Sequence, residues 1–279
     1  MKRLFITLGF FAFCIQLQAQ PTKTGAIQFE STFDPAAMAA ANGIKLTDQM
    51  LARMPKSSVT SFELLFNLTN ASYMPVEETE DSNNSGGGGG MRFGGFGGNN
   101  NREYFYSFAD HKLTQVFDMN DTTFFMAAQL GKATQMNFAP AAVTPPVVEY
   151  VKSEETKKIL GYTCNKVTIK TTSKRKILDE EREIVDQTNL WYTKELGFDF
   201  SPNPALWTEG AVLAIEGKGN NVLAKSIEYR NVSNKDVNLP KKGTVITPDD
   251  FRAKMEQMRK QMRGNRPGGT GQVRAITIN

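Results

Sequence analysis

The side chains that could carry out hydrolysis are few, and their spacing matches no catalytic motif. His111 is the one histidine of the chain, with Ser107 and Asp110 close to it in sequence. A serine hydrolase needs a histidine that takes the proton of its nucleophile, often held on a tight strand-to-helix turn. These residues fall instead in a predicted hairpin turn, where a solvated histidine is the simpler interpretation. We assign no catalytic residue, and the sequence favours a non-enzymatic protein while leaving an enzyme open.

The usual motifs for metals and phosphates are also incomplete. Zinc sites draw on clusters of Cys and His, but Cys164 and His111 lie far apart in the sequence. The run from Asp118 to Asp121 hints at calcium, yet Thr122 and Thr123 break the loop pattern that calcium needs. The glycines from Gly86 to Gly90 are not followed by the Gly-Lys-Ser/Thr ending of a phosphate-binding loop. We therefore predict no metal site and no cofactor.

Two groups of residues could bind a partner. One is Arg92, Phe93 and Phe96, in the Gly- and Asn-rich segment 77–102, which is predicted to be a flexible loop inserted between strands. The alternative is that this segment is only a spacer. The other group is the helical face formed by Met255, Met258 and Met262, since methionine suits adaptable contact surfaces. The alternative there is a helix that packs on the sheet.

The first nineteen residues have the pattern of a cleavable signal peptide. Lys2 and Arg3 precede an apolar run of about 12 residues, and Ala19 is a small residue suited to cleavage. Because crossing a membrane takes about 20 residues, this run is too short to span one. Cys14 lies inside the run, without the small residues of a lipoprotein motif before it. We expect export to the periplasm or the outer membrane.

The mature chain should be a self-sufficient domain with nearly balanced charge. Its formal charge of +4 falls to +2 once Lys2 and Arg3 are removed, which gives no argument for nucleic acid as a partner. No second apolar run is long enough for a transmembrane span. Cys164 would be the one remaining cysteine, so no intramolecular disulfide could form, and we expect it to be a small buried hydrophobe.

Period-two alternation predicts a mainly β fold. About ten segments rich in β-branched and aromatic residues are joined by short turns, which indicates a single large antiparallel sheet, curved or bent into a half-barrel. The predicted strands are Thr24–Phe33, Ser58–Leu68, Glu103–Phe108, Lys112–Phe117, Thr122–Gln129, Val147–Lys152, Thr163–Thr171, Lys174–Val185, Thr188–Thr193, Ala211–Glu216 and Leu223–Asn231.

Helices are predicted at three places. Asp34 and Pro35 begin a short helix, and a second covers Leu46 to Met54. The clearest one begins after Thr247 with a cap, a first-turn proline and early acids, and carries an amphipathic pattern. The expected organisation is a signal peptide at 1–19, a β-rich domain at 20–246, a C-terminal helix at 247–264 and a loose tail at 265–279.

Three segments carry motifs of a known family. Thr156 to Val167 (TKKILGYTCNKV) resembles the pattern K-x-I-x-G-Y-x-C-x-K-A, and Leu190 to Leu196 (LWYTKEL) resembles A-W-Y-T-x-E-I. Gly210 to Ile215 (GAVLAI) lies where the pattern G-L-P-G-L-I falls, without its first Gly-Leu-Pro. On these motifs the chain resembles the GLPGLI family of exported Bacteroidetes proteins. A related group of exported β-proteins shares two of the three motifs.

The resemblance implies a half-barrel similar to periplasmic lipoprotein carriers, and it implies no catalytic residue. The leading hypothesis is therefore an exported envelope protein that binds an apolar small molecule or a protein partner in a curved sheet. One alternative is a hydrolase-type enzyme with a carboxylate-based site. Another is an accessory subunit of an outer-membrane complex that uses the glycine-rich segment.

Overall fold

A computed structural model describes residues 23–41, 46–54, 57–76, 103–119, 121–131, 147–177 and 180–264. The expected signal peptide, the candidate residues Arg92, Phe93 and Phe96, and the expected tail at 265–279 lie outside these residues. The elements are β1 (Gly25–Phe33), α1 (Pro35–Ala41), α2 (Asp48–Arg53), β2 (Ser58–Phe66), β3 (Asn70–Pro75), β4 (Glu103–Ser107), β5 (Lys112–Met119), β6 (Thr122–Ala128), β7 (Val147–Ile159), β8 (Tyr162–Ile177), β9 (Glu180–Thr193), β10 (Ala211–Glu216), β11 (Asn220–Tyr229), α3 (Asn234–Val237), β12 (Thr244–Val245) and α4 (Pro248–Gly264).

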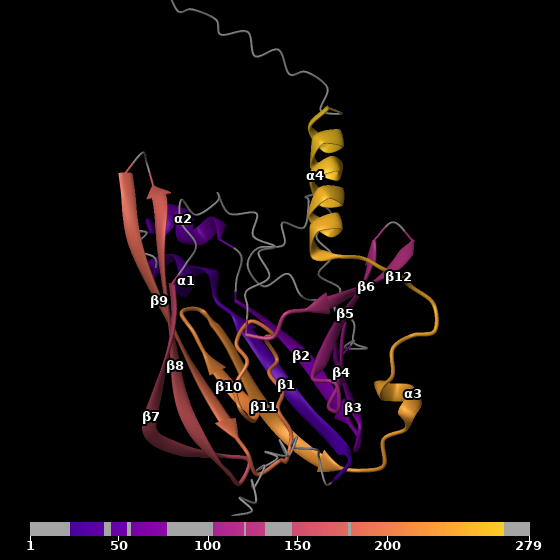
Figure 1. Cartoon of the computed structure of the whole chain (residues 1–279). Helices are drawn as coiled ribbons and strands as arrows, with labels where there is room; N and C mark the ends of the chain where they lie inside the picture. Colours follow the sequence, from indigo (N-terminus) through magenta and orange to yellow (C-terminus); the bar gives the residue numbers. More distant parts are fainter. Residues whose placement is uncertain are drawn as a thin grey trace, which may run out of the picture.

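The strands form one large sheet in the order β12-β6-β5-β4-β3-β2-β1-β11-β10-β9-β8-β7. Neighbours are antiparallel except for the short parallel pair of β12 and β6. The first strand thus sits in the middle of the sheet, between β2 and β11. The sheet is strongly curved but not closed, with β7 at one end and β12 at the other (Figure 1). The predicted fold class is confirmed.

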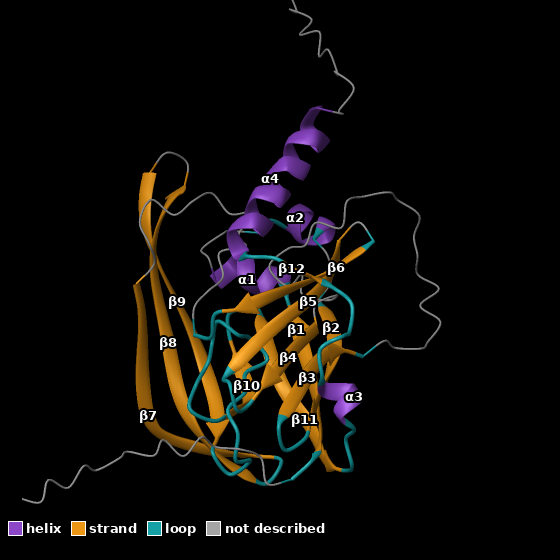
Figure 2. Cartoon of the chain, turned by 45° about the vertical axis from the view of Figure 1, so that its right-hand side comes forward, coloured by secondary structure: helices purple, strands orange, loops and turns teal. Residues whose placement is uncertain are grey.

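The main core covers one face of strands β1 to β5 and also includes side chains from β7 to β11. The register places Phe29 opposite Phe62, and Phe62 stacks on Tyr73 with ring centroids 5.1 Å apart. The loop between β9 and β10 packs on the same face, where Phe198 lies 4.9 Å from Phe66 and Phe200 lies 5.4 Å from Tyr73. Figure 2 shows loop segments between the β7–β9 arm and the rest of the sheet. The protein's own aromatic side chains therefore fill this face.

Trp191 and Tyr192 are adjacent on β9 and alternate in direction. The sequence predicts that one of them enters the core, and in the structure both are buried. Trp191 joins the main core, while Tyr192 joins a second cluster with Val167, Ile169 and Leu190. Both are enclosed because β9 is an internal strand of the sheet that is covered at this point on each side.

Several element boundaries differ from the predicted ones. Lys174–Val185 is not one strand, because β8 ends at Ile177 and pairs back onto β9 from Glu180. The sequence has no glycine or proline between the two strands. The alternating pattern therefore predicts one continuous strand where the structure has two. β3 was not predicted, since its sequence NASYMP is short, ends in proline and shows no sustained alternation of apolar and polar residues. The four-residue α3 was also missed, although Ser233 and Asp236 form a capping box at its start.

The predicted helix starts are confirmed where the caps can be checked. Asp34 accepts a hydrogen bond from the Ala37 amide at 3.0 Å, and the Thr247 hydroxyl accepts one from the Asp250 amide at 3.1 Å. α4 is held at its first turns, where Phe251 packs edge-on against Phe117 at 5.0 Å. Beyond that point the helix projects away from the sheet (Figure 1). None of the described helices is both long and apolar enough to cross a membrane.

Candidate functional site

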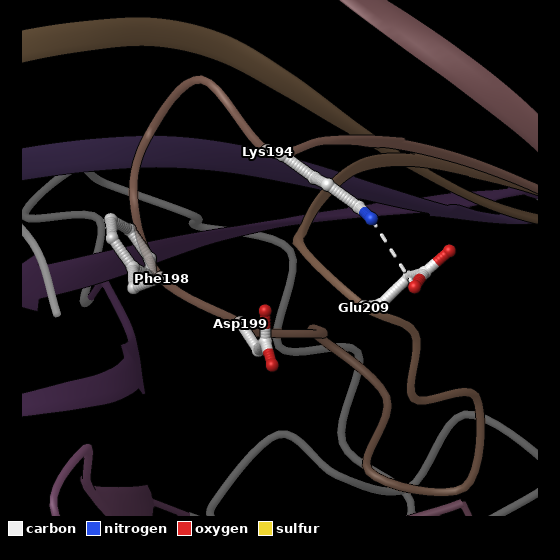
Figure 3. Close-up of a pocket in the computed structure, with 4 residues that line it drawn as sticks. All are labelled: Lys194, Phe198, Asp199 and Glu209. Atoms are coloured by element: carbon white, nitrogen blue, oxygen red, sulfur yellow. Dashed lines mark ion pairs between the residues drawn. The ribbon is translucent and has the colours of Figure 1, made fainter. Parts of the chain in front are cut away.

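A small pocket opens beside the loop that joins β9 to β10. It is lined by Lys194, Phe198, Asp199 and Glu209 and has a volume of about 170 Å³. All four residues belong to this one loop (Figure 3). The Lys194 side chain reaches toward Glu209, whereas Asp199 stands apart from that ion pair. The pocket thus presents charges of both signs within a small space.

The position of Asp199 is fixed by the two aromatic residues that flank it. Phe198 and Phe200 are 1% and 2% exposed, so both are anchored in the core. The Phe200 amide donates to the Gly210 carbonyl at 3.3 Å, and the Phe200 carbonyl accepts from the Val212 amide at 2.8 Å. Because side chains alternate along an extended segment, Asp199 points away from the core that its neighbours enter. The carboxylate is therefore held on a rigid backbone.

Glu209 is the anchor of an ion-pair network. Lys152 on β7 donates to its Oε1 at 2.8 Å, and Lys194 lies 3.2 Å from its Oε2. The Tyr192 hydroxyl donates to Oε1 at 3.4 Å. The hydrogen bonds from Lys152 and Lys194 lower the pKa of Glu209 to about 2. Both oxygens of this carboxylate are thus occupied, and it remains charged at any physiological pH.

Asp199 has the opposite environment. Its burial raises the pKa of the carboxyl above the ordinary value, and the electrostatic interactions with His111 and Lys194 only partly offset that effect. Among the described residues, no hydrogen bond or ion pair joins its carboxylate to another side chain. Two carboxylates of one pocket therefore have pKa values moved in opposite directions, an arrangement that is frequent in functional sites.

His111 lies in the turn between β4 and β5, as the sequence predicts, and it is exposed. Its backbone is left-handed, with φ at 48°, and its Nδ1 lies 3.0 Å from the hydroxyl of Tyr106. Neither Ser107 nor Asp110 is directed to the ring, since the Ser107 hydroxyl donates to Asp110 at 2.9 Å. The sequence gives no hint that His111 is near Asp199. That proximity is a product of the tertiary fold.

A second pocket, of about 110 Å³, lies where two of the family-like motifs meet. It is lined by Lys23, Phe66, Tyr162, Glu195, Leu196 and Tyr229. The Thr163 amide donates to Glu195 Oε1 at 3.1 Å, and the hydroxyls of Tyr162 and Tyr229 are hydrogen-bonded to each other. The Gly-Tyr-x-Cys and Trp-Tyr-Thr segments thus hold each other in place, which gives these motifs a structural role.

The strand β7 forms a free edge of the sheet. Four of its apolar side chains are well exposed: Val147 at 59%, Val148 and Tyr150 at 46%, and Val151 at 43%. The pairing of β7 with β8 shifts register between Lys152 and Thr156, so the edge is regular only on either side of this bulge. The apolar part, Val147 to Lys152, pairs in register with residues 167–172 of β8.

Two of the predicted partner-binding residues can be placed. Met255 and Met258 are half-buried on α4, but the cluster that includes Phe251 contains neither of them. The side chain of Met262 lies outside the described residues, as do Arg92, Phe93 and Phe96. Cys164 is 0% exposed, as expected for a small buried hydrophobe, and its burial raises the pKa of its thiol to about 11.

No metal site forms within the part of the chain that the structure describes. There, no three His, Cys, Asp or Glu side chains lie close enough together to hold a metal ion. The pocket residues Lys194, Asp199 and Glu209 were not singled out from the sequence. The alternation Phe198-Asp199-Phe200 is a signal that could have identified Asp199, because two large apolar residues that flank a single acid fix its direction.

Comparison with known proteins gives no family assignment. No family model matches the sequence, and no curated protein matches it either. Two structures of PNGF-II, in the P21 and C2 space groups, are similar at 14% identity, with TM-scores of 0.46 and 0.47. Each alignment covers 85% of this chain and 34% or 33% of the other. The chain thus spans about a third of the length of PNGF-II, and a likeness at this level does not bear on function.

Proposed function

We propose that this chain is an exported, non-enzymatic protein of the cell envelope that binds a protein partner at the edge strand β7. The observation that carries the proposal is the exposed apolar edge from Val147 to Lys152. Its occupant is an extended segment of another envelope protein, which adds to the sheet as a further strand. Export rests on the pattern of residues 1–19, and membership of the GLPGLI family rests on the motif resemblance.

The physical basis is the set of unpaired backbone groups along β7. In an antiparallel pair, alternate residues direct their N–H and C=O groups to the neighbour, and the others direct them outward. β7 has β8 on one side and no described strand on the other. Proteins usually protect such edges with charge, proline or bulges. Here the bulge after Lys152 protects only one part. The Val147–Lys152 part carries four exposed apolar side chains against two charged ones, Glu149 and Lys152.

The geometry limits what a partner strand can do. A regular segment of six residues spans about 20 Å at roughly 3.3 Å per residue. Beyond it lie the bulge and the charged residues Glu154, Glu155, Lys157 and Lys158. A partner strand therefore pairs with Val147–Lys152 through its main chain, and it gains specificity from contacts with Val148 and Tyr150 on one face and Val147 and Val151 on the other.

The other hypotheses have less support from the described residues. Ligand pockets for small apolar molecules usually measure about 300–1,000 Å³, whereas the two pockets here measure about 170 and 110 Å³. A carboxylate-based hydrolase needs two free carboxyl groups, and both oxygens of Glu209 are occupied by lysine ammonium groups and Tyr192. The accessory-subunit hypothesis depends on the segment 77–102, outside the described residues.

Site-specific photo-crosslinking in the native envelope tests the proposal. A photoreactive amino acid replaces Val148 on β7, and in a matched control it replaces Val185, an equally exposed valine (42%) on the internal strand β9. We expect a discrete adduct with a second polypeptide from position 148 and none from 185. The adduct should disappear when Val151→Lys adds a charge to the edge.

Three results would contradict this proposal: no adduct at 148, equal adducts at both positions, or an adduct insensitive to Val151→Lys. An adduct that contains only this chain would replace the envelope partner with a second copy. Export is tested separately by N-terminal sequencing of the protein from an envelope fraction, where a start at or near Gln20 is expected.

A further inference from the structure

Within the described part of the chain, the carboxylate of Asp199 has no hydrogen-bond or ion-pair partner, although its backbone is anchored on both sides. Buried polar groups are almost always hydrogen-bonded, and a half-buried carboxylate without a bond is costly. Asp199 sits between two anchored aromatic residues, so its backbone cannot shift to bring the carboxylate to a distant donor. The nearby charges of His111 and Lys194 act on it without a hydrogen bond. The fold thus keeps an acceptor open in the pocket.

The same pocket holds a donor that is only partly used. The ammonium group of Lys194 has three N–H donors, and one described contact, with Glu209 Oε2 at 3.2 Å, occupies one of them. Glu209 is itself held by Lys152 from the other side. Lys194 is therefore oriented by an ion pair but keeps donors free for a further acceptor. Figure 3 shows Asp199 apart from this pair.

The volume restricts the ligand to a very small molecule. About 170 Å³ is the room of five or six waters at roughly 30 Å³ each, which matches a molecule of about six non-hydrogen atoms. Such a ligand needs a cationic donor for Asp199 and an anionic acceptor for Lys194. A molecule with a charge of one sign would leave one wall of the pocket without a partner.

We propose that the pocket formed by Lys194, Phe198, Asp199 and Glu209 binds a small zwitterion of the size of glycine or alanine. Its ammonium group donates to Asp199, and its carboxylate accepts from Lys194. Glu209 does not touch the ligand but positions Lys194. This binding site is independent of the β7 edge, since the ligand occupies the loop between β9 and β10 and leaves the backbone of β7 free.

Removal of the Asp199 charge should not destabilise the folded protein. A residue kept for folding lowers stability when its interaction is removed. Burial of Asp199 is only partly compensated by its neighbours, so Asp199→Asn, which keeps the shape and removes the charge, should leave the melting temperature unchanged or raise it. Loss of binding without loss of stability is the mark of a group kept for a ligand.

Calorimetric titration of the purified full chain with glycine is the test. Acetate, which has only the carboxylate, and methylammonium, which has only the ammonium group, serve as single-charge probes. We expect glycine to bind in the millimolar range, and acetate and methylammonium each to bind at least tenfold more weakly. Asp199→Asn and Lys194→Met should each weaken glycine binding at least tenfold. Lys152→Met is the matched control: it removes the other lysine from Glu209 but leaves the pocket lining intact, so binding should change less than threefold.

Each contrary result overturns the inference. If acetate or methylammonium binds as tightly as glycine, the site recognises a single ion and not a zwitterion. If no glycine binding is measurable, or if Lys152→Met weakens it as much as Lys194→Met does, the pocket is a surface ion-pair network. If Asp199→Asn lowers the melting temperature by several degrees, Asp199 is satisfied within the fold.

Discussion

Replacement of Gly210 by alanine should damage both the fold and the pocket. Gly210 has a φ of +146°, which residues with a Cβ rarely adopt, and an added Cβ would lie 2.6 Å from the Thr193 carbonyl oxygen. The backbone strain costs about 1–3 kcal/mol, and overpacking against a fixed carbonyl adds about 1–3 kcal/mol. Alanine also restricts the unfolded chain, which offsets about 0.4–1 kcal/mol. The free energy of unfolding should therefore fall by about 1–5.6 kcal/mol.

Gly161 is a matched control for this substitution. It forms the turn between β7 and β8 with Leu160, and its φ is +88°. An added Cβ there has no atom within 4 Å. Gly161→Ala thus introduces backbone strain of about 1–2 kcal/mol without a clash, and after the same offset the loss should be about 0–1.6 kcal/mol. Denaturant titration followed by circular dichroism measures both variants.

The pocket provides a second readout of the same change. The Gly210 carbonyl accepts from Phe200, and Gly210 directly follows Glu209, so a shift here moves both walls of the pocket. Glycine binding should weaken in Gly210→Ala and stay the same in Gly161→Ala. If the two variants lose equal stability, close contact with Thr193 is not what requires a glycine, and the reasoning from the backbone approach is refuted.

Three further predictions concern the groups that hold the site and the C-terminal helix. Phe198→Ala should lower the free energy of unfolding by about 3–5 kcal/mol because it empties a buried aromatic position, and a loss below 1 kcal/mol by denaturant titration would contradict the anchoring role of this residue. The ion pairs of Glu209 should contribute little to stability, since they are exposed to solvent. The pKa of Glu209 is lowered from its ordinary value of 4.5 to about 2 in the folded protein, so the contribution is present above pH 4.5 and is lost as the pH falls toward 2. The difference in stability between wild type and Glu209→Gln should therefore vanish in acid and shrink in high salt. Phe251→Ala should release α4 from the sheet and reduce the helical signal in circular dichroism, whereas Met258→Ala should not.

The sequence was informative where local patterns determine structure. Alternation located most strands, and Asp34 and Thr247 marked helix starts because an N-terminal cap is a local hydrogen bond. The pattern failed at β3, a short segment without sustained alternation that lies as a strand between β2 and β4 and pairs with both. It also failed at the β8–β9 turn, which is set by the pairing of two long strands and not by a turn residue.

The pocket could not be derived from the sequence because its parts are brought together by packing. Asp199 and Glu209 come from an irregular loop with no periodicity, and the insertion of Phe198 and Phe200 into the core decides where that loop lies. Lys152 reaches Glu209 from a strand that is distant in the sequence. No spacing rule relates Asp199, Glu209 and Lys152 in the sequence. The anchoring residues Phe198 and Phe200 can be recognised there only as single apolar residues within a loop.

The thiol of Cys164 offers a direct test of whether the Gly-Tyr-x-Cys motif serves the fold or carries reactivity. Its burial raises the pKa to about 11, so at pH 8 the reactive thiolate is on the order of a hundredfold rarer than for a free cysteine of pKa about 8.5. Complete enclosure blocks access as well. A thiol reagent should therefore modify the native protein at least a hundredfold more slowly than the denatured protein. Equal rates in the two states would show that Cys164 is accessible, and the motif would then have to be explained by chemistry at the thiol instead of by packing.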